Sequence, residues 1–300
     1  MKFDVIGFGA LNIDRLYRVD RIAGVGEERF IRGYSETPGG SAANTIVGLA
    51  RLGHKVGYVG KVGDDSEDEL LLNDFKDEGV DTRGIIVSDK FRTGVVIGFV
   101  DDSGERTLYV DPGANDSMSL EEVDRKYISN TKFLHLSSFV GEKPFETQKF
   151  LLQDMPNVKV SFDPGELYVR RGLAALSPIL RRCFVVFPNE DELRLLTGRE
   201  FIDGARTLIE LGVKIVAVKL GEKGCYITNG DESFLINSYK VNVVDSTGAG
   251  DAFCAGFLHG LLSCRDLRMC GQIANFIAAR KIEKVGAREG LPRLSDLPVV

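Results

Sequence analysis

Short apolar runs separated by helical patterns are the feature that most constrains the fold of this chain. Runs rich in Val, Ile and Phe recur along the sequence, and many of the segments between them repeat apolar residues with the period of an α-helix. This alternation is typical of βαβ units, whose parallel strands are buried on both faces of the sheet. The sequence therefore predicts an α/β fold with a mostly parallel central sheet. The clearest expected strands are 3–7, 56–59, 133–136, 158–162, 184–187 and 215–218.

Two stretches, 12–37 and 92–111, break this rhythm. Each places a glycine-containing turn between strand-like residues, and Gly104 in the second turn suits a positive φ angle. Both are interpreted as antiparallel hairpins that pair into one small sheet beside the main sheet. A third hairpin, turned at Asn229-Gly230, is expected at an edge of the main sheet. The expected organisation is a core of residues 1–11, 38–91 and 112–300, with a small β unit of residues 12–37 and 92–111.

An acidic run at residues 64–69 is interpreted as the start of a helix. Ser66 with Glu69 predicts a capping box ahead of an apolar stripe, and Gly79 is expected to end that helix. Negative charge is favourable at a helix N-terminus. The run therefore has a simpler explanation than a metal site.

Composition and charge exclude several classes of function. The 300 residues include 44 Asp and Glu against 38 Lys and Arg, a formal net charge of −6, without a long basic block. Because phosphate backbones are bound by clustered Lys and Arg, nucleic acid is not expected as a partner. No apolar run approaches the ~20 residues that cross a bilayer, so no membrane partner is expected. The chain is expected to be cytoplasmic.

Cysteines, histidines and glycine motifs narrow the choice further. Five cysteines without CxxC spacing favour reduced, mostly buried thiols. His54, His135 and His259 lie far apart in the sequence, which disfavours a zinc site. The sequence has no GxxxxGK[ST] loop, and residues 7–12 lack the third glycine of the dinucleotide fingerprint. A P-loop enzyme and a dehydrogenase are therefore disfavoured.

The most informative segment, residues 243–251, runs from a strand into a turn of small residues and then into a helix. Backbone N–H groups of Ala249, Gly250 and Asp251 should lie at the helix start, where no bulky side chain blocks the approach of an anion. Asp251 can serve as the general base that accepts a hydroxyl proton when an alcohol attacks phosphorus. The alternative is that Asp251 only stabilises the first helical turn through the helix dipole.

Several motifs, in their order along the chain, resemble those of the ribokinase or PfkB family of carbohydrate kinases. GGSAAN at 39–44 precedes DSTGAGD at 245–251, and the second motif is the specific one. The remaining matches are the motifs at 12–14, 60–64, 189–192 and 221–224. The resemblance implies a ribokinase-like three-layer α/β/α domain with a small β lid formed by the two hairpins. It also implies Mg²⁺-dependent transfer of the γ-phosphoryl group of ATP to a hydroxyl of a sugar or sugar phosphate.

The resemblance also implies roles for individual residues. Asp251 would be the base, and Gly248, Ala249 and Gly250 would form an anion hole with its backbone amide. The residues implied to bind acceptor hydroxyls are Asn12, Asp14, Gly39, Gly40 and Asn44. The residues implied to border the nucleotide are Asn189, Lys219, Gly221, Gly224 and Asn275, while Glu192 would act on Mg²⁺ through water.

A monovalent cation is a further implication of the resemblance. Residues 286–290 are similar to a segment that, together with the backbone around Asp245 and Thr247, binds such a cation in some members of the family. The charged residues Lys281 and Lys284 argue against that cation in this chain.

Most of these residues also have a purely structural explanation. Gly39-Gly40 suits a plain strand-to-helix turn, and Asn44 suits a hydrogen bond at a helix start capped by Ser41. The Asn-x-x-Glu motif at 189–192 forms a capping box without any catalytic role. The loop 221–224 is explained equally well as a turn between two strands.

The identities of the acceptor and of the phosphoryl donor stay open at this point. Residues 163–167 lack the Asp-x-Asn-x-Arg pattern that some family members use for a keto-deoxy acid. Arg106, Arg170 and Arg171 are candidates to meet a phosphate or another acidic group of the acceptor, and a solvated surface is the alternative for each. ADP is the alternative donor to ATP, because mainly backbone and apolar contacts are expected around the base.

Two other functions are kept as alternatives. A nucleoside kinase of the same fold would use aromatic side chains for stacking, and the candidates are Phe8, Tyr17, Phe30 and Tyr34. A ligand-binding regulator without catalysis is the second alternative. The sequence also favours a homodimer through the lid, whose expected exposed apolar residues are Val95, Ile97 and Phe99.

Overall fold

The computed structural model describes residues 2–102 and 105–297 and contains two sheets. Ser103 and Gly104 lie outside the described residues, so the predicted positive φ of Gly104 is not part of the description. No helix among the described residues combines the length and the apolar character that crossing a bilayer requires.

The main sheet has nine strands in the order β13-β12-β11-β10-β9-β8-β1-β4-β5. The strands from β11 to β5 run parallel, and the hairpin β12-β13 continues the sheet antiparallel at one edge. All expected strands and the edge hairpin are confirmed. The bounds are β1 Phe3–Phe8, β4 Val56–Gly63, β5 Asp81–Ser88, β8 Thr131–Ser137, β9 Lys159–Asp163, β10 Cys183–Val186, β11 Ile215–Lys219, β12 Cys225–Thr228 and β13 Ser233–Ile236.

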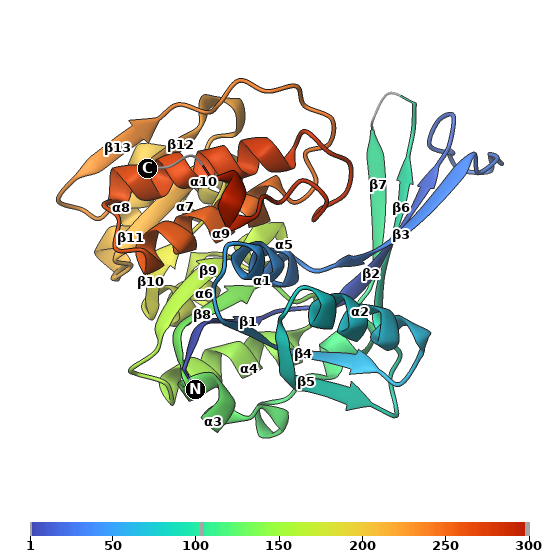
Figure 1. Cartoon of the computed structure of the whole chain (residues 1–300), viewed down its shortest axis with the longest axis horizontal. Coiled ribbons are helices and arrows are strands. Elements are labelled where there is room, and N and C mark those ends of the chain that lie inside the picture. Colours follow the sequence, from blue (N-terminus) through green and yellow to red (C-terminus); the bar gives the residue numbers. More distant parts are fainter. Residues whose placement is uncertain (1, 103–104, 298–300) are drawn as a thin grey trace.

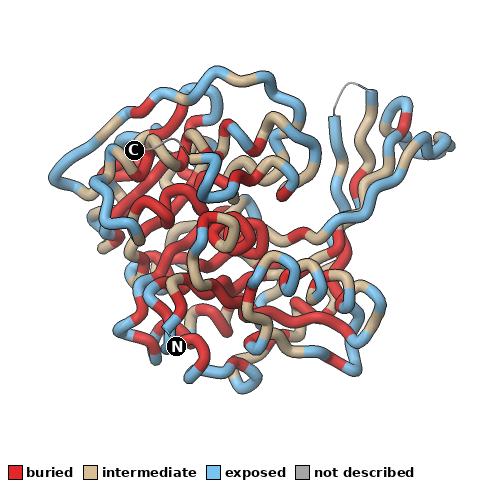
Figure 2. Tube along the Cα trace, in the orientation of Figure 1, coloured by how far each residue is buried: buried red, intermediate tan, exposed pale blue. Residues whose placement is uncertain are grey.

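Helices cover both faces of this sheet, so the core has three layers (Figure 1). One apolar core lies between the sheet and α1, α2, α9 and α10, and a second lies between the sheet and α3 to α8. Figure 2 shows that the buried residues concentrate in the sheet and on the inner sides of these helices. The α-helices are α1 Ser41–Arg51, α2 Ser66–Asp77, α3 Arg125–Ser129, α4 Glu142–Gln153, α5 Gly165–Val169, α6 Leu173–Leu180, α7 Glu190–Thr197, α8 Phe201–Leu211, α9 Ala249–Leu262 and α10 Leu267–Lys281. Short 3-10 turns are η1 Gly113–Ser117, η2 Leu120–Glu122, η3 Gly221–Lys223 and η4 Leu294–Asp296.

The small sheet extends away from the layered core (Figure 1) and has the order β3-β2-β6-β7. Its strands are β2 Asn12–Arg18, β3 Gly33–Gly39, β6 Gly94–Val100 and β7 Arg106–Asp111. Each hairpin is antiparallel, and β2 pairs parallel with β6. The prediction that the two hairpins join into one sheet is confirmed. That this sheet closes over a site as a lid stays a prediction.

The two faces of the small sheet carry different side chains. Cross-strand register places Leu16 and Leu108 on the face of Asp14, and Arg106 pairs with Val100 on that face. We call this the Asp14 face. The opposite face, here the outer face, carries Tyr17, Tyr34, Ile97, Phe99 and Tyr109.

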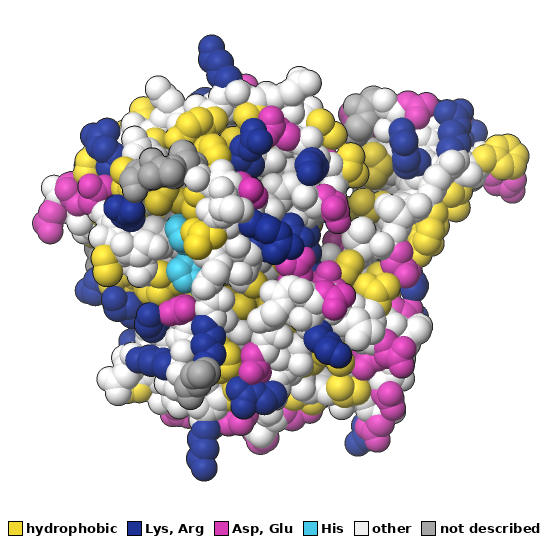
Figure 3. Space-filling model, viewed as in Figure 1, with side chains coloured by type: hydrophobic (Ala, Val, Ile, Leu, Met, Phe, Trp, Pro, Cys, Tyr) yellow, Lys and Arg dark blue, Asp and Glu magenta, His cyan; other side chains and the backbone are white. Residues whose placement is uncertain are grey.

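The expectation of an exposed apolar lid face needs one correction. Val95 is buried, because it lies at the base of the sheet next to the core, whereas Ile97 is 36% exposed and Phe99 is half-buried. Tyr34 and Tyr109 add larger exposed apolar area to the same outer face. Figure 3 shows hydrophobic side chains along the small sheet.

The expected capping box of α2 is displaced by one residue. Asp65 is the N-cap and pairs with Asp68, whereas Ser66 is already helical and Glu69 is exposed. The Asp65 carboxylate also accepts hydrogen bonds from the Thr93 amide at 2.7 Å and the Thr93 hydroxyl at 2.7 Å. A carboxylate that satisfies the helix start and a neighbouring loop therefore takes the place of the serine.

Two of the histidines lie close together in space although they are far apart in the sequence. His54, after α1, and His259, near the end of α9, lie with Nε2 and Nδ1 2.8 Å apart. Even so, no group of three or more metal-ligating side chains gathers among the described residues. The five cysteines are free, and Cys264 is the exposed one.

Candidate active site

The Asp251 carboxylate lies where the starts of α1 and α9 meet. It accepts hydrogen bonds from Ser41 Oγ at 2.7 Å and Asn44 Nδ2 at 2.8 Å. The Asn44 side chain therefore serves Asp251 and not its own helix start. Ser41 is not the cap of α1 either, because Gly40 takes that position with φ 106°. Two motifs distant in sequence thus form one site around a single carboxylate.

Two carboxyl groups in this region titrate above their ordinary range. Burial raises the pKa of Asp251 to about 6, against the lowering effect of Asn44 and Ser41. Burial likewise raises the pKa of Asp14 to about 6, and the negative charge of Asp251 adds to the effect. A pKa just below neutrality suits a general base, because the group is ionised at pH 7 and still able to take a proton.

Backbone amides next to Asp251 are the candidates for the expected anion site. Gly248 has φ 77°, and a Cβ there would lie 2.8 Å from the Ala287 carbonyl oxygen, so glycine is required. The Ala249 amide donates to the Ser246 carbonyl at 3.1 Å and is thereby occupied. Within residues 2–102 and 105–297, the Gly250 and Asp251 amides donate to no protein acceptor. Two of the amides that the sequence indicated are thus available at the N-terminus of α9.

Lys219, the last residue of β11, brings a positive charge to the same place. Its Nζ donates to Asp163 Oδ2 at 2.7 Å, and a Cβ built on Gly250 would lie 3.3 Å from it. Burial alone would lower the pKa of Lys219, but the carboxylates of Asp163 and Glu192 hold it well above its usual range. The lysine is therefore a fixed cation beside the free amides.

The motif at 189–192 forms the expected capping box of α7. Asn189 Oδ1 accepts from the Glu192 amide at 2.7 Å, and Glu192 Oε2 accepts from the Asn189 amide at 2.8 Å. Burial raises the pKa of Glu192, and the nearby charge of Lys219 opposes the shift. The cap thus also holds a carboxylate near Lys219, and the structural and functional readings are compatible.

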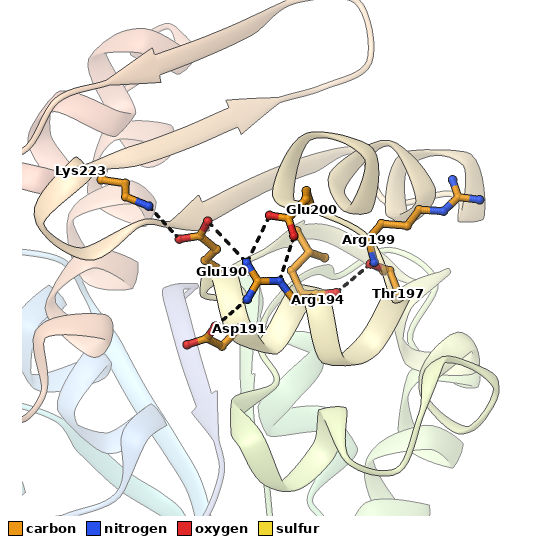
Figure 4. A network of polar contacts seen from close by, with 8 residues as sticks. Glu190, Asp191, Arg194, Thr197, Arg199, Glu200 and Lys223 are labelled. Atoms are coloured by element: carbon orange, nitrogen blue, oxygen red, sulfur yellow. Dashed lines mark hydrogen bonds and ion pairs between the residues drawn. The ribbon is translucent and has the colours of Figure 1, made fainter.

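The other two carboxylates of this motif have different partners. Glu190 lies 3.4 Å from Lys223, and Asp191 lies 3.4 Å from Arg194 (Figure 4). The Glu190–Lys223 pair ties the start of α7 to the turn at η3, whereas the Asp191–Arg194 pair lies within α7. Glu192 is consequently the acidic residue of this segment that stays near Lys219.

Both glycines of the loop after β11 have positive φ angles, and Gly224 also lacks room for a side chain. Gly224 has φ 94° and would place a Cβ 2.0 Å from the Ile236 carbonyl oxygen. Gly221 has φ 59°, and a Cβ there would meet nothing within 4 Å. Asn275 donates its side-chain amide to the Ile236 and Asn237 carbonyls at 3.2 and 3.1 Å. Asn275 therefore supports the backbone next to this loop.

The acceptor residues implied by the sequence gather where β2 and β3 leave the core. The Asp14 carboxylate lies over Gly39, where an added Cβ would meet its oxygens at 2.4 and 2.5 Å. At Gly40, with φ 106°, a Cβ would lie 2.3 Å from the Ala10 carbonyl oxygen. Asn12 Oδ1 accepts from Asn115 Nδ2 at 3.0 Å. The close approach of backbone and carboxylate explains why glycine is needed here.

Gly39→Ala should displace the Asp14 carboxylate and weaken acceptor binding. If Asp14 binds the acceptor as the resemblance implies, the acceptor KM should rise by roughly 10- to 100-fold, because hydrogen bonds from a charged group are lost. The KM for the nucleotide should not change, because Asp14 lies on the small sheet. Steady-state kinetics with each substrate varied in turn measure both constants.

Gly33→Ala is the matched control, since Gly33 lies on the same strand and a Cβ there makes only ordinary contacts at 3.5 Å or more. Unchanged acceptor KM in Gly39→Ala, or an equal rise in Gly33→Ala, would contradict a role of Asp14 in acceptor binding.

The three candidate arginines occupy different settings. Arg106 Nη1 donates to Thr247 Oγ1 at 3.1 Å and thus joins the Asp14 face to the DSTGAGD turn. Arg170 pairs with Glu166 one helical turn away at 2.8 Å, on the surface. Arg171 pairs with Glu142 and lies over the ring of Phe145. Only Arg106 among these three contacts a residue of the site.

Several contacts of the site were not found by sequence reasoning. Arg288 is buried and donates from Nε to Asn44 Oδ1 at 2.8 Å, so it orients the amide that holds Asp251. It also pairs with Asp74, and its Nη2 has no hydrogen-bond partner among the described residues. Ser41 and Asp163 were missed as well. Ser41 lies inside the GGSAAN motif, which could have indicated it, whereas nothing local marks Arg288 as buried.

The implied monovalent-cation site does not fit the residues present. Asp245 Oδ1 accepts from the Thr247 amide at 2.9 Å, and Oδ2 accepts from the Gly286 amide at 2.8 Å. The Asp245 carbonyl accepts from Lys281 Nζ at 2.9 Å. Hydrogen-bond donors of the protein, including the buried Lys281 ammonium group, thus occupy the Asp245 oxygens that would ligate a cation.

Comparison with known proteins agrees with this geometry. Residues 2–294 match the pfkB family carbohydrate kinase model. An uncharacterized sugar kinase from Archaeoglobus fulgidus is 44% identical over 253 residues, 83% of this chain and 100% of the relative. An ATP-dependent ribose-1-phosphate kinase from Halopiger xanaduensis is 34% identical over 286 residues, 95% of this chain and 93% of the relative.

A ribokinase from Thermotoga maritima has the same fold, with a TM-score of 0.89 and 28% identity over 98% of this chain and 97% of that structure. The three-layer core with its small second sheet is therefore the ribokinase fold. The family match spans nearly the whole chain, and the site lies where its motifs converge. The chain belongs to the pfkB family of carbohydrate kinases and is a sugar kinase, a phosphotransferase with an alcohol group as acceptor.

Proposed function

We propose that the enzyme transfers the γ-phosphoryl group of ATP to a hydroxyl of a sugar or sugar phosphate, with Asp251 as general base. The observation that carries the proposal is the Asp251 carboxylate, held by Ser41 and Asn44, beside two unoccupied amides. Asp251 takes the hydroxyl proton as the acceptor oxygen attacks phosphorus. The amides of Gly250 and Asp251 then stabilise the charge on the transferred group.

Lys219 and Glu192 are assigned to the phosphate side of the reaction. Lys219 lies next to Gly250, where its charge reaches the same oxygens as the free amides. Glu192 and Asn189 would hold Mg²⁺ through water, since a partly buried carboxylate beside a phosphate site suits this hard cation. When bound, Mg²⁺ neutralises charge on the β- and γ-phosphates. Gly221, Gly224 and Asn275 are proposed to border the base of the nucleotide.

Arg106, a cationic residue of the small sheet, favours a phosphorylated sugar as the acceptor. Arg106 lies on the Asp14 face, so one arginine and one carboxylate can meet the two ends of such an acceptor. The relative named as a ribose-1-phosphate kinase supports the same class. Stacking on a nucleoside base has less support, because Tyr17 and Tyr34 lie on the outer face and Phe8 is buried in the core.

A matrix of donors and acceptors tests this function. ATP and ADP are each combined with neutral sugars, sugar phosphates and nucleosides, and the nucleotide product is measured. Activity with ATP on a sugar phosphate, reduced selectively in Arg106→Ala, is the expected result, with Arg170→Ala as control. Equal rates on neutral and phosphorylated sugars, unaffected by Arg106→Ala, would remove the phosphorylated acceptor. Nucleoside turnover alone would favour the alternative kinase, and no turnover would contradict the proposal.

We also propose that two copies associate through the outer face of the small sheet. Tyr34 is 54% exposed and Tyr109 is 62% exposed, and together with Ile97 they give this face an apolar character that suits an interaction surface. Light scattering at micromolar concentration is expected to give a dimer, and a monomer would contradict the proposal. Action in the cytoplasm stays a prediction.

The pH profile should show a steep acid limb. Asp251 must be ionised to accept a proton, and Asp14 must be ionised to bind hydroxyls most strongly; the pKa of each is about 6. We therefore expect kcat/KM to be level above pH 7 and to fall below pH 6 with a slope greater than one on logarithmic axes, because two protons are bound. A slope of one would limit the effect to a single carboxyl group, and an unchanged rate at pH 5 would contradict both pKa values.

A further inference from the structure

Lys281, the last residue of α10, is charged and yet fully buried. The side chain is 0% exposed, and its Nζ donates to the Asp245 carbonyl oxygen at 2.9 Å. Burial lowers the pKa of Lys281, and the carboxylates of Asp245 and Asp251 oppose this shift because they favour the protonated form. A lysine is rarely buried without a specific partner, so its position here needs an explanation.

The ammonium group lies at the junction of two segments. The Asp245 side chain accepts from the amides of Thr247 and Gly286, and the Asp245 amide donates to the Ile282 carbonyl at 3.1 Å. Further along, the tight approach of Gly248 to Ala287 brings the same two segments into contact. Lys281 therefore supports the turn from which the free amides at the start of α9 project.

These two segments are the ones that the family resemblance associated with a monovalent cation. We propose that the Lys281 ammonium group replaces that cation, so that this enzyme needs no potassium for activity. The ammonium group carries the same single charge and satisfies a carbonyl oxygen of the turn. Because it is covalently attached, it is present in every molecule and loses no translational freedom on binding.

The inference rests on the proposed phosphoryl transfer, so its test has one readout that needs turnover and one that does not. Wild-type enzyme and Lys281→Met are titrated with KCl, and tetramethylammonium chloride keeps the ionic strength constant. Wild-type activity should stay constant. Lys281→Met should lose about tenfold or more in kcat without potassium and regain a substantial part with it, the scale of a lost electrostatic contact near the reacting group.

The melting temperature provides the second readout. Potassium should raise it in Lys281→Met and leave it unchanged in the wild type, since a cation can bind only where the ammonium group has been removed. Lys284→Met is the matched control, because Lys284 is exposed and lies three residues further along the chain. It should behave like the wild type in both measurements.

The outcomes decide between replacement and a merely structural role. Activation of the wild type by potassium would overturn the inference, as would a folded Lys281→Met that ignores potassium in both readouts. If Lys281→Met is unfolded without salt, recovery of a cooperative melt in potassium supports the inference, and continued unfolding contradicts it. If no acceptor is phosphorylated at all, the melting temperatures still test Lys281 while the proposed function fails.

Discussion

Asp251→Asn should lower kcat by roughly 10²- to 10⁴-fold while the affinity for nucleotide stays close to that of the wild type. This range is typical of a positioned general base. Asparagine has the same shape and can still engage Ser41 and Asn44, so the starts of α1 and α9 should keep their arrangement. The loss then reports on the missing proton acceptor.

Stability gives this variant an independent signature. The pKa of Asp251 is raised from 3.8 to about 6, so the unfolded chain binds fewer protons there between these values, and stability falls as pH rises through that window. Asp251→Asn should therefore melt higher than the wild type at pH 8 and equally at pH 4. Calorimetry at the two pH values checks this.

Asp191→Asn is the matched control for the catalytic loss, because the Asp191 side chain is 92% exposed at the start of α7. It should change neither kcat nor the melting temperature appreciably. Near-normal turnover in Asp251→Asn, with the protein folded, would contradict the assignment of the base.

Arg288→Met should be the most destabilising of the substitutions considered. The change leaves the Asp74 carboxylate without its ion-pair partner and Asn44 Oδ1 without its donor. Breaking a largely buried pair from one side costs about 3–5 kcal/mol. Because Asn44 is then free to turn away from Asp251, kcat should also fall, by roughly 10- to 100-fold. Urea unfolding and steady-state kinetics measure the two effects.

A double substitution separates the two roles of Arg288. Asp74→Asn combined with Arg288→Met removes both charges, so stability should largely return, while Asn44 still lacks its donor and kcat stays low. Recovery of kcat together with stability would mean that Arg288 acts only through the fold. A loss of less than about 1 kcal/mol in Arg288→Met would contradict its description as part of a buried pair.

Local patterns predicted most of the fold, and the exception has a physical reason. The sequences of the buried strands are apolar runs, because helices cover both faces of these strands. β5 was not predicted, since Asp81–Ser88 lies at the sheet edge and buries only Gly84 and Ser88 fully. Its mixture of polar and apolar residues does not form the apolar run by which the other strands were predicted. The Asp65 cap was missed for a related reason, because its choice over Ser66 depends on Thr93 in another segment.

The turn proposed to be catalytic was noticed in the sequence because its small residues and the helix that follows are contiguous. The contacts that tune it are not local. Asn44 and Asp251 are 207 positions apart in the sequence, and Arg288 is 244 positions from Asn44. Neither pairing leaves a trace in composition or periodicity. The contact between His54 and His259 could not be predicted for the same reason.

The separate origins of the two halves of the site bear on how such enzymes diversify. The strands of the small sheet are encoded in two short stretches, whereas Lys219, Glu192 and Asp251 belong to the layered core. Under the proposed assignment, a lineage can change its sugar preference largely through the hairpins. The machinery for phosphoryl transfer would be inherited intact.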